Sequence, residues 1–170
     1  VLELTERLFS QLMKTVKNIE IPIPFPRLSY AESIARYGTD KPDTRFGLEL
    51  TDISDLVGES NFQVFKNALA AGGQVKAICA PGVAGYSRKE VEELTELVKR
   101  FGARGLATFA KGESEIKSNV AKFFTDDIMN AIFERVGANV GDLVLVVADK
   151  PSVVAQSLDF LRREMGKRLG

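Results

Sequence analysis

The sequence contains no histidine, and it has only one cysteine in 170 residues. Without an imidazole, the chain cannot build a Ser-His or Cys-His nucleophile, nor a metal site that depends on histidine. A zinc site would need to combine one thiolate with carboxylates, which is an unfavourable ligand set. Much of hydrolytic and metal-dependent chemistry is therefore excluded for these residues acting alone.

The single cysteine, Cys79, lies in the apolar run of residues 75–80. One cysteine cannot form an internal disulfide, and this usage is typical of a reducing compartment. A catalytic thiolate would need a nearby base, whereas a small buried hydrophobe needs none. We therefore interpret Cys79 as a core residue.

The chain also lacks an excess of either charge, since Lys plus Arg and Asp plus Glu number 23 each. Dedicated nucleic-acid binders usually carry a basic excess, because phosphate neutralisation supplies much of their affinity. Any contact with RNA must therefore use a local patch or draw on a larger protein. No apolar stretch approaches membrane-spanning length. We expect a cytoplasmic protein with no membrane contact.

The spacing of apolar residues predicts helices at both ends of the chain. Leu8, Leu12 and Val16 form a stripe that ends near Asn18, and the alternating prolines of residues 21–26 then predict an extended connector. Near the C-terminus a second stripe follows a helix start at Asp149 and Pro151. It consists of Val154, Leu158, Leu161 and Met165.

Further helix starts are predicted where a capping residue precedes an acid or amide at the third helical position. The three Ser-based pairs are Ser29 with Glu32, Ser60 with Gln63, and Ser87 with Glu90. Thr125, followed by Asp126 and Asp127, predicts another start, because acids favour the positive end of the helix dipole.

Four short segments between these helices are predicted strands: residues 74–80, 105–109, 120–124 and 143–147. The last is a continuous apolar run, which is typical of a strand covered on both faces. Residues 47–148 therefore predict a compact α+β unit with a small mixed or antiparallel sheet. Residues 1–46 and 149–170 are predicted as helical flanks with little to pack on.

Several polar or glycine-containing motifs have a functional and a structural interpretation. Residues 37–46 hold acids and bases that form local ion pairs in a turn, unless Lys41 and Arg45 reach a phosphate. Residues 72–74 spell Gly-Gly-Gln, and residues 82–85 have Gly-x-x-Gly spacing; each is more typical of a turn beside a strand. The basic residues within 162–168 form either a solvated helix end or an RNA contact.

Taken together, the segments resemble bacterial-type aspartyl-tRNA synthetases, which are class II aminoacyl-tRNA synthetases. The similarity lies first in Pro24-Phe25-Pro26-Arg27-Leu28-Ser29-Tyr30-Ala31-Glu32 and in Tyr37-Gly38-Thr39-Asp40-Lys41-Pro42-Asp43-Thr44-Arg45. Weaker matches follow in the family's order at residues 87–90, 102–107, 121–123 and 141–143, and at Leu161-Arg162. Thr108 departs from the family, which often has an aromatic residue there.

This resemblance implies that residues 47–148 are a GAD-type insertion domain. Residues 1–46 and 149–170 would be flanks that belong to the class II catalytic domain. The ATP-holding arginines of class II motifs 2 and 3 have no counterpart here, and neither does the anticodon-reading OB-fold. The resemblance therefore implies no catalytic, cofactor-binding or metal-binding residue in this chain. ATP and magnesium belong to the parent enzyme.

For the parent, the resemblance implies an aspartate–tRNA ligase that is active as a homodimer and acts through aspartyl-adenylate. It leaves open whether the parent charges tRNA-Asp alone or also tRNA-Asn. Partners of this chain would be the remainder of the synthetase and, through it, tRNA. Arg27, Lys41 and Arg45 are the predicted contacts to tRNA or to the neighbouring domain.

Two other hypotheses remain at this point. The chain could be a stand-alone GAD-type module that binds a protein or RNA. It could also be an independent enzyme using Asp40, Lys41 and Asp43, although such chemistry needs a pocket and a shifted lysine pKa.

Overall fold

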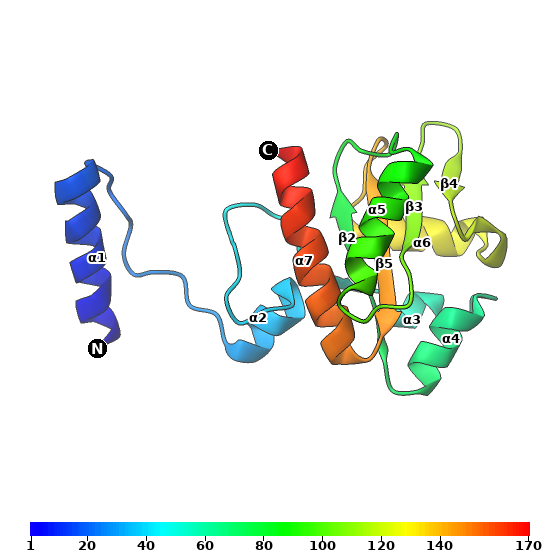
Figure 1. Cartoon of the computed structure of the whole chain (residues 1–170), viewed down its shortest axis with the longest axis horizontal. Coiled ribbons are helices and arrows are strands. Elements are labelled where there is room, and N and C mark those ends of the chain that lie inside the picture. The colour runs from blue at the N-terminus through cyan, green and yellow to red at the C-terminus, as the bar shows by residue number, and fades with distance from the viewer.

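The computed structural model describes residues 1–170 and has the expected α+β fold (Figure 1). Its five strands form one antiparallel sheet in the order β1-β2-β5-β3-β4. The strands are β1 (Thr51–Asp52), β2 (Gln74–Ala80), β3 (Ala107–Lys111), β4 (Ile116–Ser118) and β5 (Leu143–Asp149). The helices are α1 (Leu2–Lys17), α2 (Tyr30–Tyr37), α3 (Ser54–Val57), α4 (Gln63–Ala70), α5 (Arg88–Lys99), α6 (Asp126–Val136), α7 (Pro151–Leu169) and the 3-10 turn η1 (Ala121–Phe123).

Strand β5 lies at the centre of the sheet and is buried on both faces, as its apolar run predicts. Val144 and Val146 point into one core, whereas Leu143, Leu145 and Val147 point into the other. This alternation arises because successive side chains of a strand face opposite sides of the sheet. A three-layer arrangement of helices, sheet and helices results.

Helices α5 and α7 cover one face of the sheet. All four residues of the C-terminal apolar stripe, Val154, Leu158, Leu161 and Met165, are fully buried there. The prediction that this flank has little to pack on is therefore wrong, because α7 closes a core that the sheet and α5 leave open. The assignment of residues 149–170 to a neighbouring catalytic domain stays a prediction.

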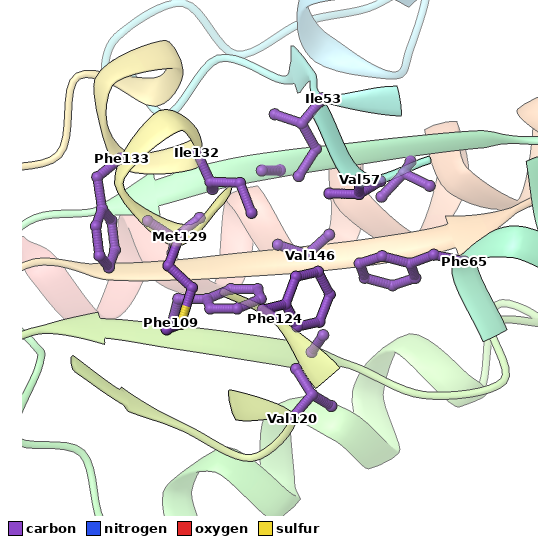
Figure 2. Packing of buried hydrophobic residues seen from close by; sticks show 14 of the residues in the cluster. Ile53, Val57, Phe65, Phe109, Val120, Phe124, Met129, Ile132, Phe133 and Val146 are labelled. Carbon is purple, nitrogen blue, oxygen red and sulfur yellow. The ribbon is translucent and has the colours of Figure 1, made fainter. Parts of the chain in front are cut away.

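Helices α3, α4 and α6 cover the opposite face, where aromatic rings fill the centre (Figure 2). The ring of Phe124 lies 5.2 Å from that of Phe109 and 5.8 Å from that of Phe65, both in edge-to-face geometry. Met129, Ile132 and Phe133 of α6 complete this core. Rings in such arrangements gain about 1 kcal/mol each beyond their burial.

Most of the predicted helix starts are confirmed. Ser87 and Glu90 form a complete capping box, and the side chains of Ser29 and Thr125 accept hydrogen bonds from the third residue beyond them. The predicted start at Ser60 is wrong, because the Ser60 hydroxyl donates back to the Val57 carbonyl oxygen at 2.7 Å. Helix α4 instead begins at Gln63 after Phe62.

The segment of residues 105–124 differs most from its prediction. β3 begins two residues later than expected, and residues 120–124 form η1 rather than a strand. The missed strand, β4, is short and pairs with β3 at the edge of the sheet. The side chain of Asn119 ends this pairing, because it accepts from the Thr108 amide and donates to the Leu106 carbonyl.

Helix α1 stands apart from the rest of the chain at the end of an extended connector (Figure 1). Its apolar face is open to solvent. The exposed side chains are Leu4, Leu8, Phe9, Leu12 and Val16. Within these residues α1 contacts only the connector, whereas α2, which belongs to the same predicted flank of residues 1–46, packs against α7 and so differs from the prediction. No helix in the chain combines the length and the hydropathy needed to cross a membrane.

Candidate functional site

The polar segment of residues 37–47 lies against α7. It starts there because α2, which precedes it, ends beside α7. The side chain of Ser29 caps the start of α2, and Gly38 ends the helix in the left-handed conformation with φ of 76°. A Cβ at Gly38 would collide with the carbonyl oxygen of Ala155 in α7. The close approach of the two backbones therefore requires glycine at this position.

Arg162 of α7 holds this segment in place and is fully buried. Its Nε donates to the Gly47 carbonyl oxygen at 3.1 Å, and its Nη2 donates to those of Asp43 at 2.6 Å and Phe46 at 2.9 Å. Its guanidinium also lies over two aromatic rings, with the carbon Cζ 4.3 Å from the centroid of Phe46 and 4.8 Å from that of Tyr37. We call this set of contacts the Arg162 clamp.

Further links join α2 and the following segment to the domain. The Lys76 ammonium group, from β2, donates to the Ala35 carbonyl oxygen at 3.1 Å. The Leu50 amide donates to the Arg36 carbonyl oxygen at 2.8 Å. The last turn of α2 is thus hydrogen-bonded to β2 and to the segment before β1, and it packs against α7.

The pKa of the clamp arginine is lowered by burial, and neighbouring groups partly offset this effect. Burial lowers the pKa of the Arg162 guanidinium, while Tyr37 and Asp43 act in the opposite direction. Hydrogen bonds from Arg45 lower the pKa of Asp43 to about 2. The bidentate pair of Arg36 with Glu49 lowers the pKa of the Glu49 carboxyl group.

The three predicted contact residues lie at the surface in different surroundings. Arg27 pairs with Glu6 at 3.2 Å and so ties the connector to α1. Arg45 pairs with Asp43 at 2.6 Å, and its side chain is 87% exposed. Lys41 is exposed and makes no ion pair. Only Lys41 and Arg45 belong to the segment that the Arg162 clamp holds, and their predicted contacts stay predictions.

The clamp itself was missed by the sequence analysis. Arg162 was grouped with a basic cluster interpreted as a solvated helix end or an RNA contact, yet it is fully buried. One signal could have revealed it. Arg162 directly follows Leu161 and lies four residues after Leu158, within the apolar stripe of its helix.

The Gly-Gly-Gln motif lies in a packed turn, and the cysteine is a weak nucleophile. A Cβ at Gly73 would lie 2.6 Å from the Asp149 carbonyl oxygen, so the Gly-Gly-Gln tripeptide forms a packed turn. Burial, followed by the nearby Asp142 carboxylate, raises the pKa of the Cys79 thiol to about 11. Such a thiol is protonated at neutral pH and is a poor nucleophile.

Comparison with known proteins gives one family and a set of close relatives. The profile of the GAD domain family matches residues 65–158. Aspartate–tRNA(Asp/Asn) ligases from Natranaerobius thermophilus, Geobacillus sp. and Symbiobacterium thermophilum are each 51% identical to this chain over 99–100% of its length. The chain spans 29% of the length of these relatives.

A hypothetical protein from Pyrococcus horikoshii OT3 is a much weaker structural match. It aligns with a TM-score of 0.38 and 15% identity, covering 62% of each chain. This similarity is too low to carry an argument about fold or function.

Proposed function

Since the chain belongs to the GAD domain family, we propose that it is the insertion-bearing segment of a bacterial-type aspartate–tRNA ligase. The observation that carries this proposal is the 51% identity to such ligases along nearly the whole chain. The parent would form aspartyl-adenylate from aspartate and ATP and then transfer the aspartyl group to tRNA. A cytoplasmic location and a homodimeric parent belong to the same proposal.

ATP and magnesium would bind elsewhere in the parent. No group of three or more His, Cys, Asp or Glu side chains in this chain could hold a metal ion. The buried arginine, Arg162, already donates to three carbonyl oxygens and is closed off from a nucleotide. The residues present do not fit a nucleotide–magnesium site, so we assign no step of the reaction to them.

The proposed role of this chain is architectural. The uncovered apolar face of α1 has no partner within the 170 residues, and an exposed face of that size favours burial against another surface. The relatives are more than three times as long as the aligned segment, which makes the remainder of the parent chain the natural partner. The Arg162 clamp would then fix the GAD domain relative to that body.

A contact with tRNA is the finer part of the proposal. Arg27 lies on the connector that follows α1, Lys41 and Arg45 lie in the segment that follows α2, and all three side chains are exposed. Exposed cations gain from neutralising phosphates, and each lost contact weakens binding uniformly across sequences. The acceptor arm would be the part of the tRNA that passes here.

We expect that changing Arg27, Lys41 and Arg45 together to glutamine in the complete parent enzyme raises the KM for tRNA about tenfold. Aspartate-dependent exchange of pyrophosphate with ATP, which needs no tRNA, should be unchanged. A matched control changes Arg88, Lys89 and Arg100 of the α5 region, which have the same types and charges and are exposed.

Two outcomes of this experiment would count against the proposal in different ways. An absence of exchange activity in the wild-type parent would remove the ligase assignment. Equal tRNA kinetics in the two triple variants would remove the tRNA contact but leave the ligase assignment intact.

The second candidate is a stand-alone GAD-type interaction or RNA-binding module. The observation that favours it is the closed core of the domain, since both faces of the sheet are covered by helices from this chain. Such a module would bind its partner without any aspartate-dependent exchange activity, so the same exchange assay on the complete gene product separates the two candidates.

A further inference from the structure

One apolar hollow lies on the face of the sheet that α3, α4 and α6 cover. It has a volume of 320 Å³ and opens between α4 and the start of β3. Phe65, Val120 and Val146, which Figure 2 labels, contribute to its lining. Asn67, Arg104, Ala107 and Ala148 also line it.

The hollow exists because small side chains form its floor. Ala107 of β3 pairs with Val146 of β5, and Ala148 lies two residues further along the same face. Helix α4 packs on β2 and β5, and the floor alanines Ala107 and Ala148 are only 6% and 8% exposed. Protein cores are otherwise packed to crystal-like density, so two alanines where larger side chains would fill the core leave space for a ligand.

The polar side chains at the rim, Arg104 and Asn67, are exposed and carry donor groups that no protein atom accepts. Arg104 is exposed, and its side chain makes no ion pair and no hydrogen bond. The side-chain oxygen Oδ1 of Asn67 accepts from Gln63 Nε2 at 2.9 Å, which leaves the Asn67 side-chain amino group free to donate. No carboxylate lines the hollow.

A smaller hollow of 80 Å³ shares Val64, Asn67, Arg104 and Ala148 with the first and continues past them. It adds one acid, Asp149, and one base, Lys150. The Asp149 carboxylate already accepts from the Lys150 amide at 2.8 Å. With Arg104, the two hollows together carry one net positive charge.

We propose that this hollow binds an apolar carboxylate, with the apolar body over Ala107 and Ala148 and the carboxylate on Arg104 and Asn67. A guanidinium pairs with a carboxylate through two parallel hydrogen bonds, and the unpartnered amide adds a third donor. The volume admits a body of about ten non-hydrogen atoms. A free aromatic or branched aliphatic acid and the C-terminal residue of an apolar peptide share this chemistry. The proposal is independent of the ligase assignment.

The test titrates 4-phenylbutyrate into the isotope-labelled 170-residue chain and follows the amide resonances by NMR. We expect saturable shifts at Phe65, Ala107 and Val146, with a dissociation constant on the order of 1 mM. The neutral analogue 4-phenylbutanol should bind about fivefold more weakly, because it lacks the charge that Arg104 pairs with.

Variants separate the charge from the cavity. Arg104→Gln should lower the affinity for phenylbutyrate to that for 4-phenylbutanol. It should leave the affinity for 4-phenylbutanol unchanged. Arg100→Gln, an exposed arginine four residues earlier that does not line the hollow, should change neither ligand. Ala148→Leu should fill the floor and abolish binding of both, and Ala107→Val serves the same purpose if that variant does not fold.

Two peptides distinguish the sources of the carboxylate. One is an acetylated tetrapeptide that ends in phenylalanine with a free carboxylate, and the other is the same peptide with a C-terminal amide. If the occupant is a peptide end, the peptide with the free carboxylate should bind more tightly than its amide and more tightly than phenylbutyrate. The reverse order assigns a free small acid. The proposal would be overturned if phenylbutyrate caused no saturable shift at a concentration ten times the expected dissociation constant. It would also be overturned if Arg104→Gln bound phenylbutyrate as tightly as the wild-type chain does. A third contrary result would be shifts at these residues with adenosine monophosphate and not with the acids.

Discussion

Replacing Arg162 with methionine is expected to lower the free energy of unfolding by about 3 kcal/mol, because the variant loses three hydrogen bonds from a charged donor, each worth on the order of 1 kcal/mol or more. Methionine matches much of the length of arginine but cannot donate to the carbonyl oxygens of Asp43, Phe46 and Gly47. The stacking of the guanidinium on Phe46 and Tyr37 is lost as well. Urea unfolding followed by circular dichroism measures the change, because the chain has no tryptophan to report it by fluorescence.

Arg163→Met on the same helix provides the matched control. The Arg163 side chain is 42% exposed and pairs with Asp159 within the helix, so its loss should cost about 1 kcal/mol or less. If both variants lose the same free energy of unfolding, the buried contacts of Arg162 stabilise the protein no more than the exposed ion pair of Arg163 does. A gain in stability for Arg162→Met would contradict the clamp outright.

Gly38→Ala is expected to have the second large effect. A Cβ at this position would meet the Ala155 backbone, and neither backbone can move without separating α2 from α7. We expect a left-handed strain of about 1–2 kcal/mol. The collision should add an overpacking cost of about 1–3 kcal/mol. Urea unfolding of the variant gives the sum.

Gly72→Ala isolates the collision from the backbone strain. Gly72 has φ of 74°, close to the 76° of Gly38, but a Cβ there would meet nothing within 4 Å. The alanine variant at Gly72 should therefore lose only the strain energy. If the two alanine variants lose the same free energy, the close approach of Gly38 to α7 does not stabilise the protein.

Local patterns predicted the elements whose signals are local. The capping pairs at Ser29, Ser87 and Thr125 and the buried run of β5 are each complete within a few residues, and all are confirmed. The prediction at Ser60 was wrong because a serine hydroxyl can donate backward as readily as it caps a helix. Similarly, residues 120–124 have strand composition, but the tertiary bonds of Asn119 divert them into η1.

The candidate site could not be predicted because it joins segments that lie more than 110 residues apart. Residues 37–47 and Leu161-Arg162 were each recognised as parts of a family resemblance, but no local pattern shows that one arginine bonds to the other segment. A basic residue inside an apolar stripe was the available hint. The general rule that basic residues at helix ends are solvated outweighed it.

The central consequence of the clamp is that residues 37–47 are held in the folded unit that α7 closes, where the sequence predicts a loose flank. Digestion with thermolysin, which cuts before large apolar residues, tests it directly. In the wild-type chain we expect the first cuts between Ile19 and Leu28, leaving a stable product that begins before α2, since unpacked segments are cleaved first.

The same digestion of Arg162→Met should add rapid cleavage before Phe46 and Leu48, because the clamp no longer protects that segment. Mass spectrometry of the early products reads out both results. A wild-type chain that is cut first before Phe46 or Leu48 would contradict the account, since residues 37–47 would then be a free flank and not part of the folded domain.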